Sequence, residues 1–293
     1  MILITGGTGT VGRELVKRLA RPEAPIRVMV RDRSKAGSVA YPGVDIVEGD
    51  FDRIDSLDAA LSGVDKAFLL AGPGERQLHL ETNFIRAAGR SKVQHIVKLS
   101  ALGAALDSPA RLLRAHAESE RHIEETGIPY THLRPNQFMQ NFLSYRESIV
   151  HRGEFYAPMG GGRASIVDVR DVAAVAVEVL NAHAHQGKIY DITGPESLTY
   201  VEMAERLTFE LGKPVAYVDV PPEAAGAGMR QAGMAPWMVD ALLELYALWR
   251  LDGAAKVTDT VKHEGKKDPI AFAEFAHDYA PQLGRMVAPD LIT

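Results

Sequence analysis

The sequence contains no cysteine among its 293 residues. This excludes disulfides, cysteine-ligated zinc, iron–sulfur clusters and thiol nucleophiles, so any redox chemistry must come from a bound cofactor. A chain without cysteine also suits a reducing compartment, and we therefore expect a cytoplasmic protein.

Long hydrophobic runs and an excess of positive charge are missing as well. No stretch approaches the roughly 18 consecutive apolar residues that a membrane span needs, and no charged leader precedes the strand-like run that starts at Ile2. The formal net charge of −5 offers no electrostatic footprint for nucleic acid. We expect a soluble monomer or homodimer with no membrane or nucleic-acid partner.

Short apolar runs alternate with helical patterns through the first half of the chain. The runs cover residues 2–5, 26–30, 44–49, 66–71, 94–100 and 130–135. Amphipathic helices are expected between them, most clearly at 11–20, 109–126 and 170–182. Strands that alternate with helices form a parallel sheet covered on both faces, so the pattern predicts an α/β, Rossmann-type doubly wound fold.

The sequence changes character after about residue 150. A glycine-rich stretch at 158–163 is followed by short strand patterns near 165–167, 188–192 and 215–220, and then by helices. We expect an NAD(P)-binding domain over 1–150, its sheet completed by part of 165–192, and a smaller α+β substrate-binding lobe over 151–293 interleaved with it. Segment 220–239, rich in Pro, Gly, Ala and Met, favours an adaptable wall of this lobe over a rigid core element.

A glycine-rich turn, GGTGTVG, follows the first strand directly and opens the first helix. Its glycines permit a tight turn and a close approach of the backbone to a pyrophosphate, which the helix N-terminus then faces. A ligand-free turn is the alternative, but the position within a βαβ unit favours a dinucleotide site. The expected contacts are Gly6, Gly7, Thr8, Gly9, Thr10, Val11 and Gly12.

The end of the second strand bears on the choice of cofactor. Arg31, backed by Arg33 and Lys35, stands where NADP sites place a cation for the extra phosphate. Asp32 is the competing residue, because a strand ending one residue later would let its carboxylate bind the ribose of NAD. The pattern favours NADP(H), with NAD(H) as the alternative.

Residues at the ends of other strands are further cofactor candidates. Asp50 and Phe51 follow the third strand and could hold the adenine; an Asx turn with a core phenylalanine is the alternative. Ala71 and Gly72 follow the fourth strand, and Pro135 ends the sixth. The carboxyl ends of parallel strands are where doubly wound folds bind ligands.

Several segments carry a family resemblance. GGTGTVG, VEGDFDRIDSLDAALSGVDKAFLL, HIVKLSALGA, GIPYTHLRPNQFMQNF, VDVRDVA and GKKDPIAFAEFAHDYA span almost the whole chain. In order and spacing they resemble the atypical short-chain dehydrogenases of the NmrA-like family, especially its triphenylmethane and quinone reductases. The resemblance implies a Rossmann fold that binds NADP(H).

The same resemblance makes the catalytic helix unusual. Most short-chain dehydrogenases use a Tyr–Lys pair on this helix and a Ser after the fifth strand, but aligning the family's Glu with Glu120 places Leu112 and His116 at the Tyr and Lys positions. Ser100 remains near the usual Ser position. This favours an acceptor that needs only hydride, such as a quinone or a dye. His116 is the candidate proton donor or orienter and Ser100 the second candidate, although a helical histidine can also be a packed residue.

Two functions remain open: a reductase of a small-molecule hydride acceptor, or a non-catalytic sensor that binds NADP(H) and reports to a protein partner. Apolar and aromatic residues after the sixth strand predict a substrate pocket and so favour the reductase. The candidate pocket residues are Asn136, Phe138, Met139, Phe142, Tyr145, Tyr156 and Trp237, with the stretch 229–237 closing over them. No His or Asp pair has the spacing of a metal site, so we assign no metal.

Overall fold

The computed structural model describes residues 1–284 and divides the chain into two compact units. Unit 1 comprises Met1–Pro135, Val169–Ile192 and Asp259–Asp268; unit 2 comprises Asn136–Asp168, Thr193–Thr258 and the chain from Pro269. The change of unit at Pro135 falls earlier than the expected boundary near residue 150. It coincides with the end of a strand, whereas the sequence signal was the glycine-rich stretch further on.

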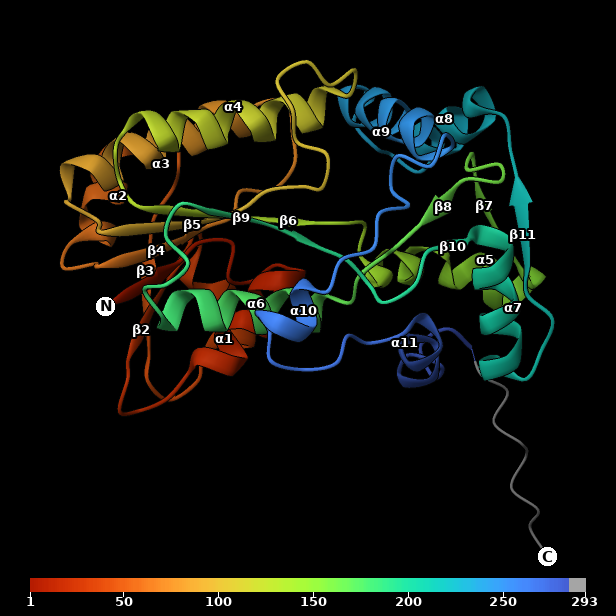
Figure 1. The fold of residues 1–293 in the computed structure, drawn as a ribbon, viewed down its shortest axis with the longest axis horizontal. Helices are drawn as coiled ribbons and strands as arrows, with labels where there is room; N and C mark the ends of the chain where they lie inside the picture. The colour runs from red at the N-terminus through yellow and green to blue at the C-terminus, as the bar shows by residue number, and fades with distance from the viewer. Residues whose placement is uncertain (285–293) are drawn as a thin grey trace, which may run out of the picture. The chain divides into compact units, whose positions relative to one another are not determined.

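A seven-stranded parallel sheet forms the centre of unit 1 (Figure 1). Its strand order is β3-β2-β1-β4-β5-β6-β9. The chain adds β2 and β3 on one side of β1 and the later strands on the other side, which confirms the doubly wound prediction. The strands are β1 (Ile2–Ile4), β2 (Ile26–Val30), β3 (Val44–Glu48), β4 (Lys66–Leu69), β5 (His95–Leu99), β6 (Tyr130–Pro135) and β9 (Lys188–Ile192).

Helices cover both faces of this sheet. Figure 1 shows α2, α3 and α4 on one face and α1, α6 and α10 on the other. Helix α1 buries Val11, Leu15, Val16 and Leu19, whose spacing places them on one side of a helix. The helices of unit 1 are α1 (Thr10–Leu19), η1 (Arg33–Val39), α2 (Ile54–Leu61), α3 (Gln77–Arg90), α4 (Arg111–Glu125), α6 (Val169–Asn181) and α10 (Thr260–His263).

Unit 2 is built from short strands and helices around an aromatic core. Phe142 lies at its centre, with ring centroids of Phe155 and Phe272 at 5.3 and 5.0 Å. The elements are η2 (Met139–Tyr145), α5 (Arg146–Arg152), β7 (Glu154–Ala157), β8 (Arg163–Ala164), β10 (Leu198–Thr199), α7 (Tyr200–Leu211), β11 (Ala216–Asp219), α8 (Pro222–Gln231), α9 (Pro236–Trp249) and α11 (Phe272–Asp278). β8 pairs with β10, and β11 pairs with β7.

One segment of unit 2 differs from the sequence prediction, and a second takes a form that the prediction left open. The strand expected near 165–167 is reduced to an isolated bridge between Val167 and Phe138, and the neighbouring strand β8 ends at Ala164. The stretch 220–239 is mostly helical, because Pro222 and Pro236 each occupy the first turn of a helix, where a missing N–H is not needed.

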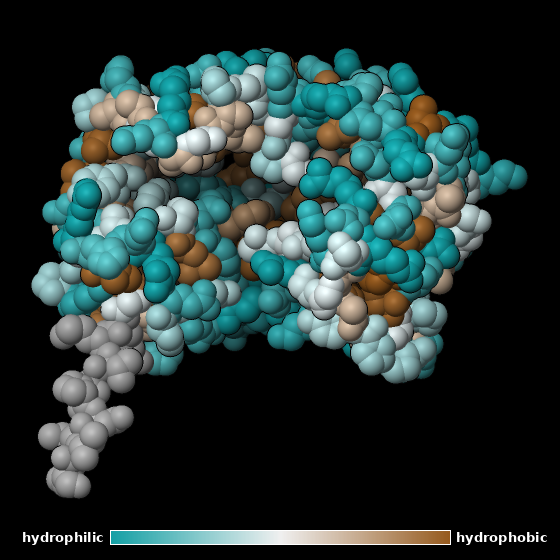
Figure 2. Space-filling view, turned by 180° about the vertical axis from the view of Figure 1, so that it is seen from behind, coloured by the Kyte–Doolittle hydropathy of each residue, from teal (hydrophilic) through white to brown (hydrophobic). Residues whose placement is uncertain are grey.

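Large exposed hydrophobic residues are few, and Figure 2 shows apolar side chains scattered among hydrophilic ones on the face that it presents. Scattered apolar side chains are normal for a protein surface. Within residues 1–284, no helix has the length and apolar character needed to cross a membrane.

Candidate functional site

The turn between β1 and α1 leaves the first turn of the helix open. Gly9 is the N-terminal cap and provides no side chain to bond the N–H groups of that turn. The Gly9 N–H donates to the Gly6 carbonyl at 3.0 Å, which closes the turn. Thr8, Gly9 and Thr10 are exposed whereas Val11 is buried. Free N–H groups at a helix N-terminus form a site suited to an anion.

Three of the glycines are required, two by close approach and one by its backbone conformation. A Cβ atom on Gly12 would lie 2.1 Å from the Gly6 carbonyl oxygen, and one on Gly7 would lie 2.5 Å from Cγ1 of Val28. Gly6 has φ +63°, a conformation that side chains other than glycine rarely adopt. The turn therefore presents bare backbone, as a site for the phosphates of a dinucleotide requires.

The charged residues after β2 have different partners. The Asp32 carboxylate accepts hydrogen bonds from the Ser34 N–H at 2.9 Å and the Ser34 hydroxyl at 2.6 Å, and these bonds lower its pKa. Arg33 donates to the Ile46 carbonyl at 2.9 Å. Arg31 is exposed and has no hydrogen-bond or ion-pair partner among residues 1–284. Arg31 is thus the cation of this turn left available for a ligand.

Other predicted cofactor residues have clear local roles. The Asp50 carboxylate accepts from the Asp52 N–H at 2.9 Å, which forms an Asx turn, and Phe51 packs edge-on against Phe84. These contacts match the alternative given for the two residues, an Asx turn followed by a core phenylalanine. Ala71 is buried and Gly72 is exposed after β4.

A buried ion pair lies beside His116. Lys98, near the C-terminal end of β5, and Glu81, on α3, are both fully buried and their charged atoms are 2.8 Å apart. The Lys98 ammonium also donates to the Leu99 carbonyl and to Nδ1 of His116, both at 3.3 Å. The Gln77 amide nitrogen is 3.3 Å from the same Nδ1 and 3.4 Å from Nε2 of the ring. Burial, followed by the charges of Lys98 and Arg134, holds the pKa of His116 well below 6.5, so this imidazole is neutral.

A second buried pair lies next to the first. Arg134 on β6 donates from Nε to Glu120 on α4 at 2.9 Å. Burial raises the pKa of Glu120, but the hydrogen bond and charge of Arg134, together with Ser100 and His132, outweigh this and the net shift is downward. Ser100 also lowers this pKa, although its buried Oγ makes no hydrogen bond of normal geometry within residues 1–284.

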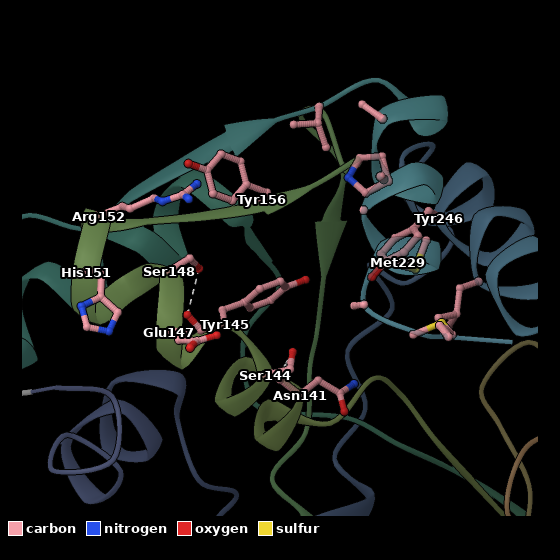
Figure 3. Close-up of a pocket in the computed structure, with 18 of the residues that line it drawn as sticks. Asn141, Ser144, Tyr145, Glu147, Ser148, His151, Arg152, Tyr156, Met229 and Tyr246 are labelled. Carbon is pink, nitrogen blue, oxygen red and sulfur yellow. Dashed lines mark hydrogen bonds between the residues drawn. The ribbon is translucent and has the colours of Figure 1, made fainter.

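Unit 2 contains a pocket of about 1240 Å³ between η2, α5, α8 and α9 (Figure 3). The Tyr145 and Tyr246 rings reach into it from η2 and α9, and Met229 lies beside Tyr246. Burial raises the pKa of both tyrosines, so both remain protonated hydrogen-bond donors. The lining residues are Gln140, Asn141, Ser144, Tyr145, Glu147, Ser148, His151, Arg152, Tyr156, Pro158, Val220, Ala224, Ala225, Gly228, Met229, Ala232, Met234, Leu242 and Tyr246.

The predicted substrate residues divide between this pocket and the interior of unit 2. Tyr145, Tyr156 and part of the stretch 229–237 line the pocket. Met139 and Phe142 are buried in the core of unit 2, and Trp237 is half-buried outside the lining.

Asn136 and Phe138 hold neighbouring backbone segments of unit 2. The Asn136 amide nitrogen donates to the carbonyl oxygens of Ser165 and Ala254 at 3.1 and 2.8 Å. Phe138 forms the bridge with Val167. Their predicted role in substrate binding therefore rests on the sequence pattern alone.

Sequence reasoning missed Lys98, Glu81 and Gln77. Lys98 lies inside an apolar strand pattern, and its partner Glu81 is 17 positions earlier on a different element. A charged residue within a buried parallel strand was the available signal, because such a charge must be paired.

The sheet order and the open glycine turn define a dinucleotide-binding protein of the Rossmann class. The model of the NmrA-like family matches residues 1–268, so the chain belongs to that family, as the sequence resemblance predicted.

Known proteins of this family resemble the chain over nearly its whole length. It is 40% identical to the NAD(P)H azoreductase of Xenophilus azovorans over 97% of this chain and 99% of that one. The Escherichia coli NADPH-dependent quinone oxidoreductase QOR2 in complex with NADPH has a TM-score of 0.87 at 28% identity, covering 95% and 99% of the two chains. The Citrobacter triphenylmethane reductase in complex with NADP(H) has a TM-score of 0.86 at 26% identity, covering 96% and 100%.

Proposed function

We propose that this protein is an NADPH-dependent reductase that delivers hydride to a planar organic acceptor such as a quinone, an azo compound or a dye. The similar proteins named above reduce acceptors of this kind, and two were solved with this cofactor. The proposal includes catalysis without the usual Tyr–Lys pair, with His116 as the first candidate and Ser100 as the second candidate for donating or orienting a proton.

The residues present fit NADPH. The bare turn formed by Gly6, Gly7, Gly9 and Gly12 suits the pyrophosphate, and Arg31 suits the 2′-phosphate because its guanidinium has no partner within residues 1–284. Asp32, whose carboxylate is bonded to Ser34, is the poorer candidate for binding a ribose. The bound cofactor supplies the hydride.

The pocket of unit 2 is the observation that carries the proposal, because a sensor needs no cavity for a small acceptor. Its volume of about 1240 Å³ exceeds that needed for several fused aromatic rings. Tyr145, Tyr246 and Met229 offer apolar and polarizable surface to a planar molecule. The two phenols hydrogen-bond to each other, which leaves one O–H to donate to a carbonyl oxygen or azo nitrogen.

The test is to mix the purified protein with NADPH and a panel of quinones, azo dyes and cationic triphenylmethane dyes while recording nicotinamide absorbance. We expect acceptor-dependent loss of NADPH. The variant Tyr145→Phe should raise KM for the preferred acceptor and leave the dissociation constant of NADPH unchanged, because Tyr145 belongs to the pocket of unit 2.

A parallel titration separates this proposal from the sensor alternative. Tight NADPH binding without turnover of any acceptor would contradict a reductase and favour a redox sensor. The search would then turn to protein partners.

A further inference from the structure

We propose that Lys98, held by Glu81, is a positioning residue that fixes His116 as the tautomer carrying its proton on Nε2. The inference rests on the proposed function, since it explains how a helix without the usual Tyr–Lys pair could present a hydrogen-bond donor to an acceptor. It assigns a role to a buried ion pair that neither cofactor binding nor the pocket of unit 2 uses.

The hydrogen-bond count at Lys98 determines the tautomer. An ammonium group has three N–H donors and no acceptor. The three partners of Lys98 are the Glu81 carboxylate at 2.8 Å, the Leu99 carbonyl at 3.3 Å and Nδ1 of His116 at 3.3 Å. Nδ1 must therefore accept, which leaves the proton of the neutral ring on Nε2, an atom that lies 3.4 Å from the Gln77 side-chain amide.

The charges around the His116 imidazole keep it neutral. Lys98 on β5 and Arg134 on β6 oppose protonation, and burial of the ring acts in the same direction. Glu81 on α3 and Glu120 on α4 each bind one of these cations. A neutral imidazole that presents N–H can stabilise negative charge developing on a substrate atom without having to transfer its own proton.

Stability alone does not explain the pair. A buried ion pair contributes little net stability compared with apolar residues of similar volume. This network is also incompletely satisfied, because Glu81 Oε1 and Gln77 Oε1 are buried without hydrogen-bond partners within residues 1–284. An apolar replacement is therefore expected to fold, which makes a clean test possible.

The experiment compares the wild type with the double variant Lys98→Met/Glu81→Met, which removes both charges together. Lys66→Met is the control: Lys66 lies on the neighbouring strand β4 and donates to the carbonyl oxygens of Leu180 and Ala182, away from His116. Proteins labelled with ¹⁵N-histidine are examined by long-range ¹H–¹⁵N correlation, and the His116 signals are assigned with His116→Gln.

The wild type and Lys66→Met should show Nδ1 unprotonated and Nε2 protonated. The double variant should show a mixture of tautomers and a loss of turnover of about tenfold or more, with NADPH affinity retained. A purely structural role for Lys98 would not move the imidazole nitrogen signals in a folded variant.

Two results would overturn the inference: protonated Nδ1 in the wild type, or an unchanged tautomer and turnover in the double variant. Absence of turnover in the wild type with every acceptor would instead overturn the proposed function. The nitrogen signals would still report whether Lys98 sets the tautomer, so the two failures are distinguishable.

Discussion

Single residues decide the proposed cofactor preference. Arg31 and Arg33 are two positions apart, yet Arg33 is bonded to the β3 backbone while Arg31 has no partner within residues 1–284. Only a cation with free donors can form charge-assisted bonds to an added phosphate without first losing other bonds.

We predict that Arg31→Glu weakens NADPH binding by about tenfold to a hundredfold, the energy of one or two charge-assisted hydrogen bonds. NADH binding should change far less, since NADH lacks the 2′-phosphate. Isothermal titration of both cofactors checks this, with Arg33→Gln as the matched control that should leave the NADPH preference in place. Equal losses for NADPH and NADH would contradict the assignment.

At the scale of elements, α8 shapes the pocket of unit 2. Ala224, Ala225 and Gly228 present small residues to the pocket, which leaves its volume open. Ala227 is on the same helix but is exposed outside the lining. The helix therefore offers a matched pair of positions for testing where the acceptor binds.

Ala225→Leu should raise KM for a three-ring dye by about tenfold, since the added side chain occupies pocket volume, while a single-ring quinone is affected less. Ala227→Leu should leave both values unchanged. Steady-state kinetics with the two acceptors measures the difference. Equal effects of the two substitutions would place the acceptor elsewhere.

The sequence predicted helices, strands and turns correctly where the pattern that indicates them lies within a few neighbouring residues. Strands β1 to β6 and helix α1 follow from apolar periodicity, and the turn from Gly6 to Gly12 follows from glycine spacing. Helices were expected after residue 220, but the bounds of α8 and α9, which begin at Pro222 and Pro236, were not given by the sequence pattern.

Residues of the candidate site were likewise predictable only where the signal is local. Arg31 adjoins its strand and was found, whereas the Lys98–Glu81 pair depends on α3 packing against β5. Such a pairing is a tertiary contact that no local pattern encodes.

At the scale of the whole molecule, buried histidines couple stability to pH. Burial lowers the pKa of His95 and of His132 to about 4, and the pKa of His116 is lowered as well. In the unfolded chain these groups titrate near 6.5. The unfolded chain therefore binds more protons than the folded chain between these values, so this stability is complete above pH of about 6.5 and is lost as pH falls toward 4.

We predict that the free energy of unfolding decreases between pH 6.5 and 5, with His95 and His132 each contributing up to about 3 kcal/mol over their full range. Urea unfolding at several pH values measures the slope. His95→Gln, which can still bond the Thr131 hydroxyl, should reduce the slope. His263→Gln, at a mostly exposed position, should not. An unchanged slope in His95→Gln would contradict the assignment.

The chain passes between the two units five times, after residues 135, 168, 192, 258 and 268. A chimera of two family members made with a single crossover between residues 136 and 267 would therefore inherit pieces of both units from each parent. The pocket lining comes from residues 140–158 and 220–246, which belong to two separate segments of unit 2. Transplanting the acceptor preference of one relative into another would need at least two matched exchanges, so point changes on α8 are the simpler route by which this family could diversify.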